Sequence, residues 1–518
     1  MQTGGPQTLP GVLASAAATR GDALAIEDGP RRWSVRDLKA AVDRAAAAFV
    51  AAGVRQGDRV AVWAPNGADW IVAALGAQSA GAALIPLNTR LKGREAGVIL
   101  RRSGAKVLCH SGAFLGLDYA RLLEGEALPA LAHRIELGTA QWDAFLARAG
   151  EGDAREAAAR AAALRGEDIA DIMFTSGTTG EPKGVMSSHA QDIRVFSEWS
   201  AICGLGPDDR YLIVNPFFHA FGYKAGWLSC LLTGAVILPM AVFDAGEVIR
   251  RIADDRVSVL PGPPTLFQSM LAHPALDRAK TRSLRLAVTG AANVPVSLIE
   301  RMRVELGFAT VITGYGLTES TGTVSMCRPG DDPETIARSC GTALPGVEVR
   351  VVDGEGHELP RGAEGEILVR GYNVMQGYLD DPAATAAAID AEGWLHTGDI
   401  GTMDARGYIR ITDRKKDMFI VGGFNCYPAE IESLISAHPQ VAQVAVTGVP
   451  DERMGEVAAA WVVPRAGAVI DDAAFIAWCR DNMANYKVPR VVHVVEALPT
   501  TASGKVQRFA LRAPQGAA

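Results

Sequence analysis

Short apolar runs alternate with helix-length segments along most of the chain, and this alternation constrains the fold more than any other feature. The runs at 60–63, 82–85, 172–174, 257–260 and 286–288 are typical of buried strands. Strands that alternate with helices favour a layered α/β fold with much parallel sheet. Hydrophobic residues make up 48% and charged residues 21% of the 518 positions, so the chain can bury a large core.

Two segments about 150 residues apart resemble each other. The letters DRVAVWAPNG from Asp58, followed by GAALIP, match DRYLIVNPFF from Asp209, followed by GAVILP. Each segment predicts a strand that ends at a proline, an apolar helix, a glycine turn and a second strand. Similar composition alone could produce such a match. We interpret it as two related α/β subdomains packed together in one large N-terminal domain.

The character of the sequence changes from about residue 345, where glycine and charged residues separate short alternating strands. This region predicts a β-rich subdomain at the end of the N-terminal domain. The charged tetrapeptide that begins at Asp413 then leads into a compact α+β segment. We therefore expect an N-terminal domain at 1–412 and a small, mobile C-terminal domain at 413–518.

The charge balance and the cysteines exclude several classes of protein. Lys and Arg number 51 against 58 Asp and Glu, and this net charge of −7 makes nucleic acid an unlikely partner. Seven scattered cysteines without a Cys-x-x-Cys pair argue against a disulfide framework and a zinc site. The N-terminus lacks a basic leader, and Gly234 and Pro239 interrupt the longest uncharged run, 225–243. We expect a cytoplasmic protein without an integral membrane segment.

The segment TSGTTGEPKGV at 175–185 carries the strongest chemical signal. It follows the strand-like run 172–174, and its glycines would let the backbone approach a bulky anion while hydroxyls and one ammonium bind it. It is not a Walker A loop, because no Ser or Thr follows the lysine. A simple Gly/Thr turn is the alternative. The predicted polyphosphate site consists of Thr175, Ser176, Gly177, Thr178, Thr179, Gly180 and Lys183.

Five further segments follow in order, and with this loop they resemble the adenylate-forming superfamily of acyl-CoA synthetases over essentially the whole chain. The resemblance implies a two-domain enzyme that uses ATP, Mg²⁺ and coenzyme A. Such an enzyme joins a carboxylic acid to AMP with release of pyrophosphate, and CoA then displaces AMP. The segments are NPFFH at 215–219, TGYGLTE at 313–319, WLHTGD at 394–399, DRKKD at 413–417 with GGFN at 422–425, and PTTASGK at 499–505.

The resemblance assigns the charged chemistry to three residues. Lys505 would reach both the acyl carboxylate and the α-phosphate, where a pre-placed charge is typically worth about 10²- to 10³-fold in rate. Glu319 would hold Mg²⁺, which prefers hard oxygen ligands, and Thr318 would contact phosphate. A surface lysine and a solvated glutamate are the alternative interpretations.

By the same resemblance, other residues bind the nucleoside and CoA. Tyr315, next to Gly314, would lie against adenine, and Asp399 would accept the ribose hydroxyls with help from Arg414. Lys416 matches the hinge about which the C-terminal domain swings between half-reactions. After the swing, the loop with Gly422, Gly423 and Phe424 would line the pantetheine tunnel.

The acyl pocket is predicted from the family pattern and from one unexpected charge. His219 would close over the acyl carboxylate, and the small residues Gly290, Ala291 and Ala292 would leave room for more than acetate. Lys224 stands in an otherwise uncharged helix, so we expect it at the pocket mouth, contacting a second oxygen function of the acid; snorkelling to solvent is the alternative.

The segments 215–226, 260–269, 288–295 and 326–332 are similar to ligases of bacterial steroid-ring catabolism that activate a hydrindane-dione propanoate. The other interpretations are a ligase for medium- or long-chain fatty acids or aryl acids, an adenylating enzyme that loads a carrier protein, and a non-catalytic acyl-nucleotide binder. The expected partners are the acid, ATP and CoA, with a homodimer as the expected assembly.

Overall fold

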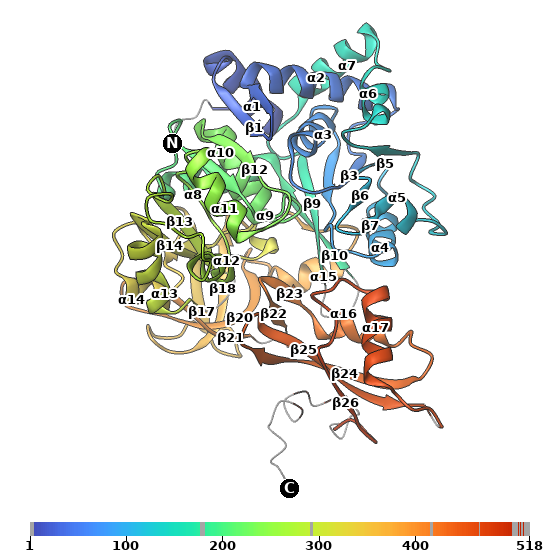
Figure 1. Cartoon of the computed structure of the whole chain (residues 1–518), viewed down its shortest axis with the longest axis vertical. Helices are drawn as coiled ribbons and strands as arrows, with labels where there is room; N and C mark the ends of the chain where they lie inside the picture. The colour runs from blue at the N-terminus through green and yellow to red at the C-terminus, as the bar shows by residue number, and fades with distance from the viewer. Residues whose placement is uncertain are drawn as a thin grey trace.

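The computed structural model describes residues 5–176, 182–290, 294–414, 418–465 and 467–499, together with 506, 508 and 511. In Figure 1 the blue to light orange segments, up to β21, form a large upper part, and the darker orange to red segments from β22 onward form a smaller part below it. The candidate site described below lies where the two parts meet.

The first subdomain is built on a seven-stranded sheet with the order β19-β10-β9-β4-β3-β5-β8. The strands from β9 to β8 pair in parallel, whereas β9 and β10 form an antiparallel hairpin. The strands are β3 (Arg59–Trp63), β4 (Ala83–Pro86), β5 (Val107–His110), β8 (His133–Glu136), β9 (Ile169–Ser176), β10 (Pro182–Ser188) and β19 (Gly377–Tyr378), with a small hairpin of β6 (Ala113–Phe114) and β7 (Leu117–Asp118). The helices are α2 (Val35–Ala51), α3 (Ala68–Ser79), α4 (Gly93–Ser103), α5 (Tyr119–Leu122), α6 (Ala140–Leu146) and α7 (Glu151–Ala163).

The second subdomain contains the strand order β11-β12-β1-β2 and, beside it, β13-β14-β15-β16. Bridges of Val259 to Tyr211 and to Leu286 join these two groups. The strands are β1 (Leu24–Asp28), β2 (Arg31–Ser34), β11 (Arg210–Ile213), β12 (Val236–Pro239), β13 (Leu286–Gly290), β14 (Thr310–Tyr315), β15 (Ser325–Met326) and β16 (Thr342–Ala343). The helices are α1 (Leu9–Arg20), α8 (His189–Cys203), α9 (Ala220–Gly222), the π-helix η1 (Tyr223–Leu228), α10 (Ser229–Thr233), α11 (Ala245–Asp254), α12 (Pro264–Leu271), α13 (Val296–Arg301), η2 (Met302–Leu306), the 3₁₀ turn η3 (Thr318–Ser320) and α14 (Pro333–Arg338).

The internal similarity of the sequence corresponds to two units with the same order. In the first, α3 connects the parallel strands β3 and β4, and in the second, α9, η1 and α10 connect the parallel strands β11 and β12. The run 257–260 was expected to be a strand, but only Val259 forms bridges. Pro261 and Pro263 follow it, and a proline has no backbone N–H to donate to a ladder.

The β-rich end of the N-terminal part is an antiparallel sheet with the order β17-β18-β20-β21, and the C-terminal part has its own sheet with the order β23-β22-β25-β24 and β26 beside β25. The chain passes from one sheet to the other between Arg414 and Phe419, next to the expected boundary. The elements are β17 (Val347–Val352), β18 (Gly365–Gly371), α15 (Pro382–Ala388), β20 (Leu395–Met403), β21 (Ile409–Arg414), β22 (Phe419–Val421), β23 (Phe424–Cys426), α16 (Pro428–Ile435), β24 (Val441–Asp451), β25 (Gly455–Pro464), α17 (Asp472–Asn482) and β26 (Val491–Val494).

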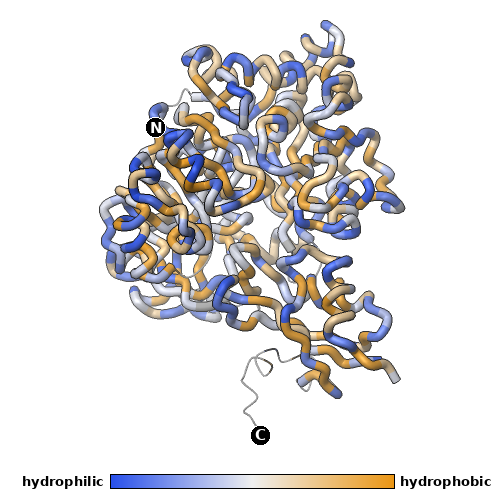
Figure 2. Tube along the Cα trace, in the orientation of Figure 1, coloured by the Kyte–Doolittle hydropathy of each residue, from blue (hydrophilic) through white to orange (hydrophobic). Residues whose placement is uncertain are grey.

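Each part has its own apolar core. The C-terminal core packs the fully buried Ile431 and Phe475 against the long strands β24 and β25, which Figure 2 colours mainly as hydrophobic. The uncharged run 225–243 forms a buried helical segment and the buried strand β12, as its glycine and proline predicted. Among the described residues, no helix is both long enough and apolar enough to cross a bilayer.

Candidate active site

A cavity of about 470 Å³ lies between the N-terminal and C-terminal parts. It is lined by the loop after β11, by the ends of β9 and β13, and by the turn between β22 and β23. A volume of this size is typical of sites for small molecules. The predicted site residues that line it are Thr175, His219, Gly290, Thr318, Gly422, Gly423 and Phe424.

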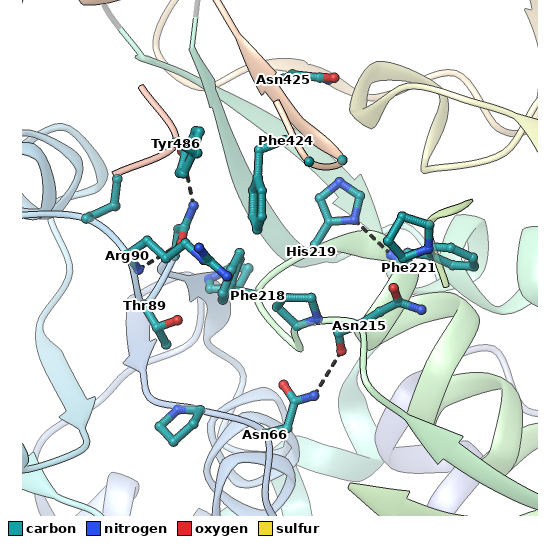
Figure 3. A pocket seen from close by; sticks show the side chains of 18 of the residues that line it. Asn66, Thr89, Arg90, Asn215, Phe218, His219, Phe221, Phe424, Asn425 and Tyr486 are labelled. Atoms are coloured by element: carbon teal, nitrogen blue, oxygen red, sulfur yellow. Dashed lines mark hydrogen bonds between the residues drawn. The ribbon is translucent and has the colours of Figure 1, made fainter. Parts of the chain in front are cut away.

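His219 lies in the loop that caps α9 and faces this cavity (Figure 3). Its Nδ1 accepts the backbone N–H of Phe221 at 3.2 Å. The side chain is open to the cavity, but the protein that surrounds it lowers its pKa by desolvation. The ring is therefore neutral near pH 7, and its proton sits on Nε2 because Nδ1 acts as an acceptor.

The floor beneath His219 is held by two asparagines. Asn66 donates through Nδ2 to the carbonyl oxygens of Ile213 and Asn215, at 3.1 and 2.9 Å, and accepts the N–H of Phe217 at 2.7 Å. Asn66 follows β3 and Asn215 follows β11, so this contact joins corresponding ends of the two similar units (Figure 3). The hydrogen bonds fix the loop that carries His219.

Phe424 enters the cavity from the C-terminal part. In Figure 3 its ring points toward Phe218 and lies between Arg90 and His219, while Asn425 points away. The ring stacks on the Tyr486 ring, with 4.6 Å between the two ring centres. The guanidinium of Arg90 lies 4.8 Å from the centre of the Phe424 ring. The two glycines before it have φ values of 54° and 87°, which L side chains rarely adopt. Arg90 and Tyr486 carried no signal in the sequence, because nothing in a local pattern marks a contact across the two domains.

A second group of residues surrounds Glu319, beside Thr318. The hydroxyl of Tyr378 donates to Glu319 Oε1 at 2.9 Å, and the ammonium of Lys183 lies 5.0 Å from the Tyr378 ring centre. Strand pairing explains why Lys183 lies near Tyr378, since Val185 of β10 lies opposite Tyr378 of β19. Burial and the carboxylate of Glu319 raise the pKa of Tyr378, so its hydroxyl keeps its proton. No motif in the sequence marked Tyr378 as part of this site.

The two residues predicted to bind the nucleoside contact each other. The Tyr315 hydroxyl donates to Asp399 Oδ2 at 2.6 Å, and both side chains are buried. The backbone of Arg414 pairs with Asp399 in the β20–β21 ladder. Gly314 pairs with Gly290 at the carboxyl ends of the parallel strands β14 and β13, the position at which α/β sheets commonly bind ligands.

The prediction that Lys224 contacts the acid from the pocket mouth is wrong. Its side chain is 1% exposed and does not line the cavity; its Nζ lies 3.0 Å from Asp171 Oδ1 and 2.8 Å from Asp192 Oδ1. The sequence offered no partner within the same helix, and the two aspartates come from β9 and α8. A lysine without a partner would have to reach solvent, but one paired with carboxylates can stay buried.

Several predicted residues lie outside the described part of the chain or have only their backbone described. The side chains of Ser176 and Arg414 belong to this group, although both residues lie in strands. The residues outside the described part are Gly177, Thr178, Thr179, Gly180, Ala291, Ala292, Lys416 and Lys505.

Comparison with known proteins identifies the class of this protein. Residues 13–379 match the AMP-binding enzyme family, and residues 430–505 match the C-terminal domain of AMP-binding enzymes. The chain belongs to this family of adenylate-forming enzymes, which use ATP. Within it, the chain is an acyl-CoA synthetase, because its curated relatives over nearly its full length are CoA ligases.

Two of these relatives are 50% identical to the chain, with 98% of the chain and 98% of the relative covered in each case. They come from Rhodococcus jostii and Mycobacterium tuberculosis, and both are named as ligases that join CoA to a (7a-methyl-1,5-dioxo-octahydroindenyl)propanoyl group. Among solved structures, an o-succinylbenzoate CoA synthetase from Bacillus subtilis, bound with its product analogue, has a TM-score of 0.84 and 28% identity and covers 96% of this chain and 98% of its own.

Proposed function

We propose that this acyl-CoA ligase activates a hydrindane-dione propanoate, a bicyclic acid with two ring ketones. The observation that carries the proposal is the 50% identity, over 98% of both chains, to two ligases named for this acyl group. The carboxylate would first attack the α-phosphorus of ATP and expel pyrophosphate. The CoA thiolate would then attack the acyl carbon and expel AMP.

The residues around the cavity suit the first step. His219 is neutral and carries its proton on Nε2, so it can donate a hydrogen bond to the carboxylate and hold the attacking oxygen. Thr175 and Thr318 line the same cavity and offer hydroxyls to phosphate oxygens, and Lys183 adds a positive charge near the ring of Tyr378. Lys505 stays the predicted contact to both carboxylate and α-phosphate. Charge stabilisation of this kind is the main task in phosphoryl chemistry.

The oxygen donors near Glu319 suit Mg²⁺, which prefers carboxylate and hydroxyl ligands and keeps several waters. Glu319 would hold the ion, and Tyr378 orients the carboxylate through its 2.9 Å hydrogen bond. When bound, the ion would neutralise phosphate charge. Tyr315 and Asp399, already joined by a hydrogen bond, would bind adenine and ribose, with Arg414 as a further sugar contact.

The second step needs a path for the pantetheine arm. Gly422 and Gly423 line the cavity beside Phe424, and without side chains they would let a narrow thiol chain approach the backbone closely. The TM-score of 0.84 to a structure that holds a CoA product analogue supports this arrangement of the two parts for thioester formation. The domain limits at 412 and 413 and the hinge at Lys416 stay predictions, as do the cytoplasmic location and the homodimer.

One observation favours a second class of substrate. Phe114, Leu115, Val242 and Phe243 line the cavity with apolar side chains, which suits a medium-chain aliphatic acid or an aryl acid. The test is the release of pyrophosphate and AMP from ATP and Mg²⁺ with a panel of aliphatic, aryl and bicyclic diketo acids, each with and without CoA. The bicyclic acid should give the highest kcat/KM with CoA as acceptor. A preference for aliphatic or aryl acids would refute the proposed acid, and turnover only with a carrier protein would refute the acceptor.

A further inference from the structure

A lysine and two aspartates form a fully buried ionic cluster outside the cavity. Lys224 Nζ lies 2.8 Å from Asp192 Oδ1 and 3.0 Å from Asp171 Oδ1, and all three side chains are at most 1% exposed. Burying such charges carries a large desolvation cost, and well-packed apolar residues often serve stability equally well. A cluster in this place therefore points to a role other than stability alone.

The charges of the cluster balance only if one carboxyl group is protonated. Burial raises the pKa of Asp192 well above its ordinary value, and the neighbouring Asp171 raises it further. Burial alone would lower the pKa of Lys224, but the two aspartates outweigh it and the ammonium stays charged. The cluster is thus one charged ammonium held between two buried carboxyl groups.

Neutral polar groups extend the cluster toward the sheet. Gln78 donates through Nε2 to the hydroxyl of Tyr223 at 3.0 Å and to the carbonyl oxygen of Ala170 at 2.9 Å. Tyr223 precedes Lys224 in η1, and Ala170 precedes Asp171 in β9. The segment around Lys224 is therefore attached to the same part of β9 twice, once by charge and once by hydrogen bonds.

The three charged residues come from segments that carry the predicted reacting groups. Asp171 lies in β9, four residues before Thr175, and Asp192 lies in α8, directly after the hairpin that carries Lys183. Lys224 lies five residues after His219. One ammonium thus connects the strand and the helix on both sides of the predicted phosphate loop to the segment that holds the carboxylate-binding histidine.

The segment around Lys224 is irregular. Residues Tyr223–Leu228 form a π-helix, and Gly226 has the non-helical values φ −90° and ψ −106°. Such irregular turns frequently occur at functional sites, and their position depends on contacts with neighbouring elements. The ion pairs of Lys224 supply such a contact near the start of this turn.

We propose that Lys224, Asp171 and Asp192 are positioning residues that set the distance between His219 and the phosphate-binding hairpin for the adenylation half-reaction. They act through Thr175, Lys183 and His219 and touch no substrate themselves. This inference rests on the proposed placement of the ATP phosphates at β9 and β10. The thioester half-reaction does not bring the hairpin and His219 together on a triphosphate, so it should depend on the cluster far less.

The experiment compares Lys224→Met with the double variant Lys224→Met/Asp171→Asn. The single variant leaves an aspartate without its cation, so we expect a lower Tm. The double variant removes the ammonium and one of its two carboxyl partners, and it should recover most of that Tm. Its pyrophosphate release per folded active site should still fall about 30-fold, within the loss that a displacement of about 1 Å can cause. The KM for ATP and the conversion of preformed acyl-AMP to acyl-CoA should each change less than threefold.

Two further variants keep the test decisive. Asp171→Asn leaves Lys224 paired with Asp192 but removes its charged contact with β9, so it should fold and still lose adenylation rate. Lys39→Met removes a lysine from the ion pair with Asp43 on the surface of α2 and should behave as wild type. A wild type that releases no pyrophosphate with any acid would refute the proposed function before the variants are compared. If the wild type is active, wild-type adenylation in the double variant or in Asp171→Asn would overturn the positioning role, as would an equal loss in both half-reactions.

Discussion

The ammonium of Lys487 lies 2.7 Å from a carboxylate oxygen of Glu95, and this buried ion pair joins the C-terminal part to α4 of the N-terminal part. A carboxylate oxygen of Glu430 lies at the same distance from this ammonium. Burial alone would lower the pKa of Lys487, but the two glutamates raise it well above its ordinary value. The pair thus fixes the arrangement in which Phe424 faces the cavity.

Replacing Glu95 with Gln should therefore weaken this arrangement. Because Glu430 keeps the ammonium paired, the free-energy cost should stay below the roughly 3–5 kcal/mol of an unpaired buried charge. We expect the rate of the thioester half-reaction to fall about tenfold. Adenylation, for which we expect the other orientation of the C-terminal domain, should change less than threefold. Single-turnover conversion of acyl-AMP measures the first rate, and pyrophosphate release measures the second. The control is Glu126→Gln, whose partner Arg101 lies in the same domain. An equal loss in both half-reactions would contradict this prediction.

Gly423→Ala should also slow the CoA-dependent step. Gly423 has a φ of 87°, where a side chain costs roughly 1–2 kcal/mol, and a Cβ there would lie 3.5 Å from Pro263. We expect CoA-dependent turnover to fall about tenfold while acid-dependent pyrophosphate release stays within threefold. Gly407→Ala is the matched control, because Gly407 has a φ of 85° and nothing lies within 4 Å of its added Cβ. A similar loss of turnover in both variants would mean that backbone strain alone, and not the cavity, explains the result.

Tyr378→Phe should weaken the use of Mg²⁺. The variant removes the hydroxyl that donates to Glu319, and the loss of such a partner of a metal ligand typically costs tenfold or more in affinity. We expect the Mg²⁺ concentration that half-saturates ATP binding, measured by calorimetry, to rise about tenfold. Tyr408→Phe provides the control, since Tyr408 donates to Asp331 at 2.6 Å outside the cavity. An unchanged Mg²⁺ dependence in Tyr378→Phe would show that Glu319 does not need this hydrogen bond.

The sequence predicted the parts of the site that are local in the chain. The strand before Thr175, the loop around His219 and the glycines before Phe424 are all marked by composition and spacing over a few residues. The structure brings Thr175, His219 and Phe424 to one cavity although they lie as far as 249 positions apart in the numbering. The family resemblance predicted this meeting, whereas local patterns alone did not.

The parts that the sequence could not supply are contacts between distant segments. Lys224 in an uncharged helix has the same local pattern whether it binds a ligand or pairs with buried aspartates, and only the packing of β9 and α8 decides. Tyr378 reaches Glu319 because β19 pairs with β10, and nothing near position 378 indicates that pairing. In both cases the deciding neighbour belongs to another element, so a pattern of spacing cannot reveal it.

His189 should make the stability of the protein depend on pH. Its Nδ1 accepts the backbone N–H of Leu9 at 3.3 Å, which connects α8 to α1, and its ring is 1% exposed. Burial lowers the pKa of His189 to about 4, whereas an imidazole in the unfolded chain titrates near 6.5. The contribution of neutral His189 to the free energy of unfolding is therefore complete above pH 6.5. It is lost as the pH falls toward 4, because only the unfolded chain then binds the proton. The difference is worth about 3 kcal/mol of unfolding free energy.

Substituting His189 with Asn should remove this dependence, since the amide oxygen can accept the Leu9 N–H but does not titrate. Calorimetric Tm values between pH 4.5 and 7.5 should fall more steeply toward acid in the wild type than in the variant. Carboxylates titrate in both proteins, so their effect on the Tm drops out of the difference between the two curves. His357→Asn serves as the control, because His357 is 73% exposed, and its curve should follow that of the wild type. Parallel curves for the wild type and His189→Asn would mean that His189 does not cause the acid sensitivity.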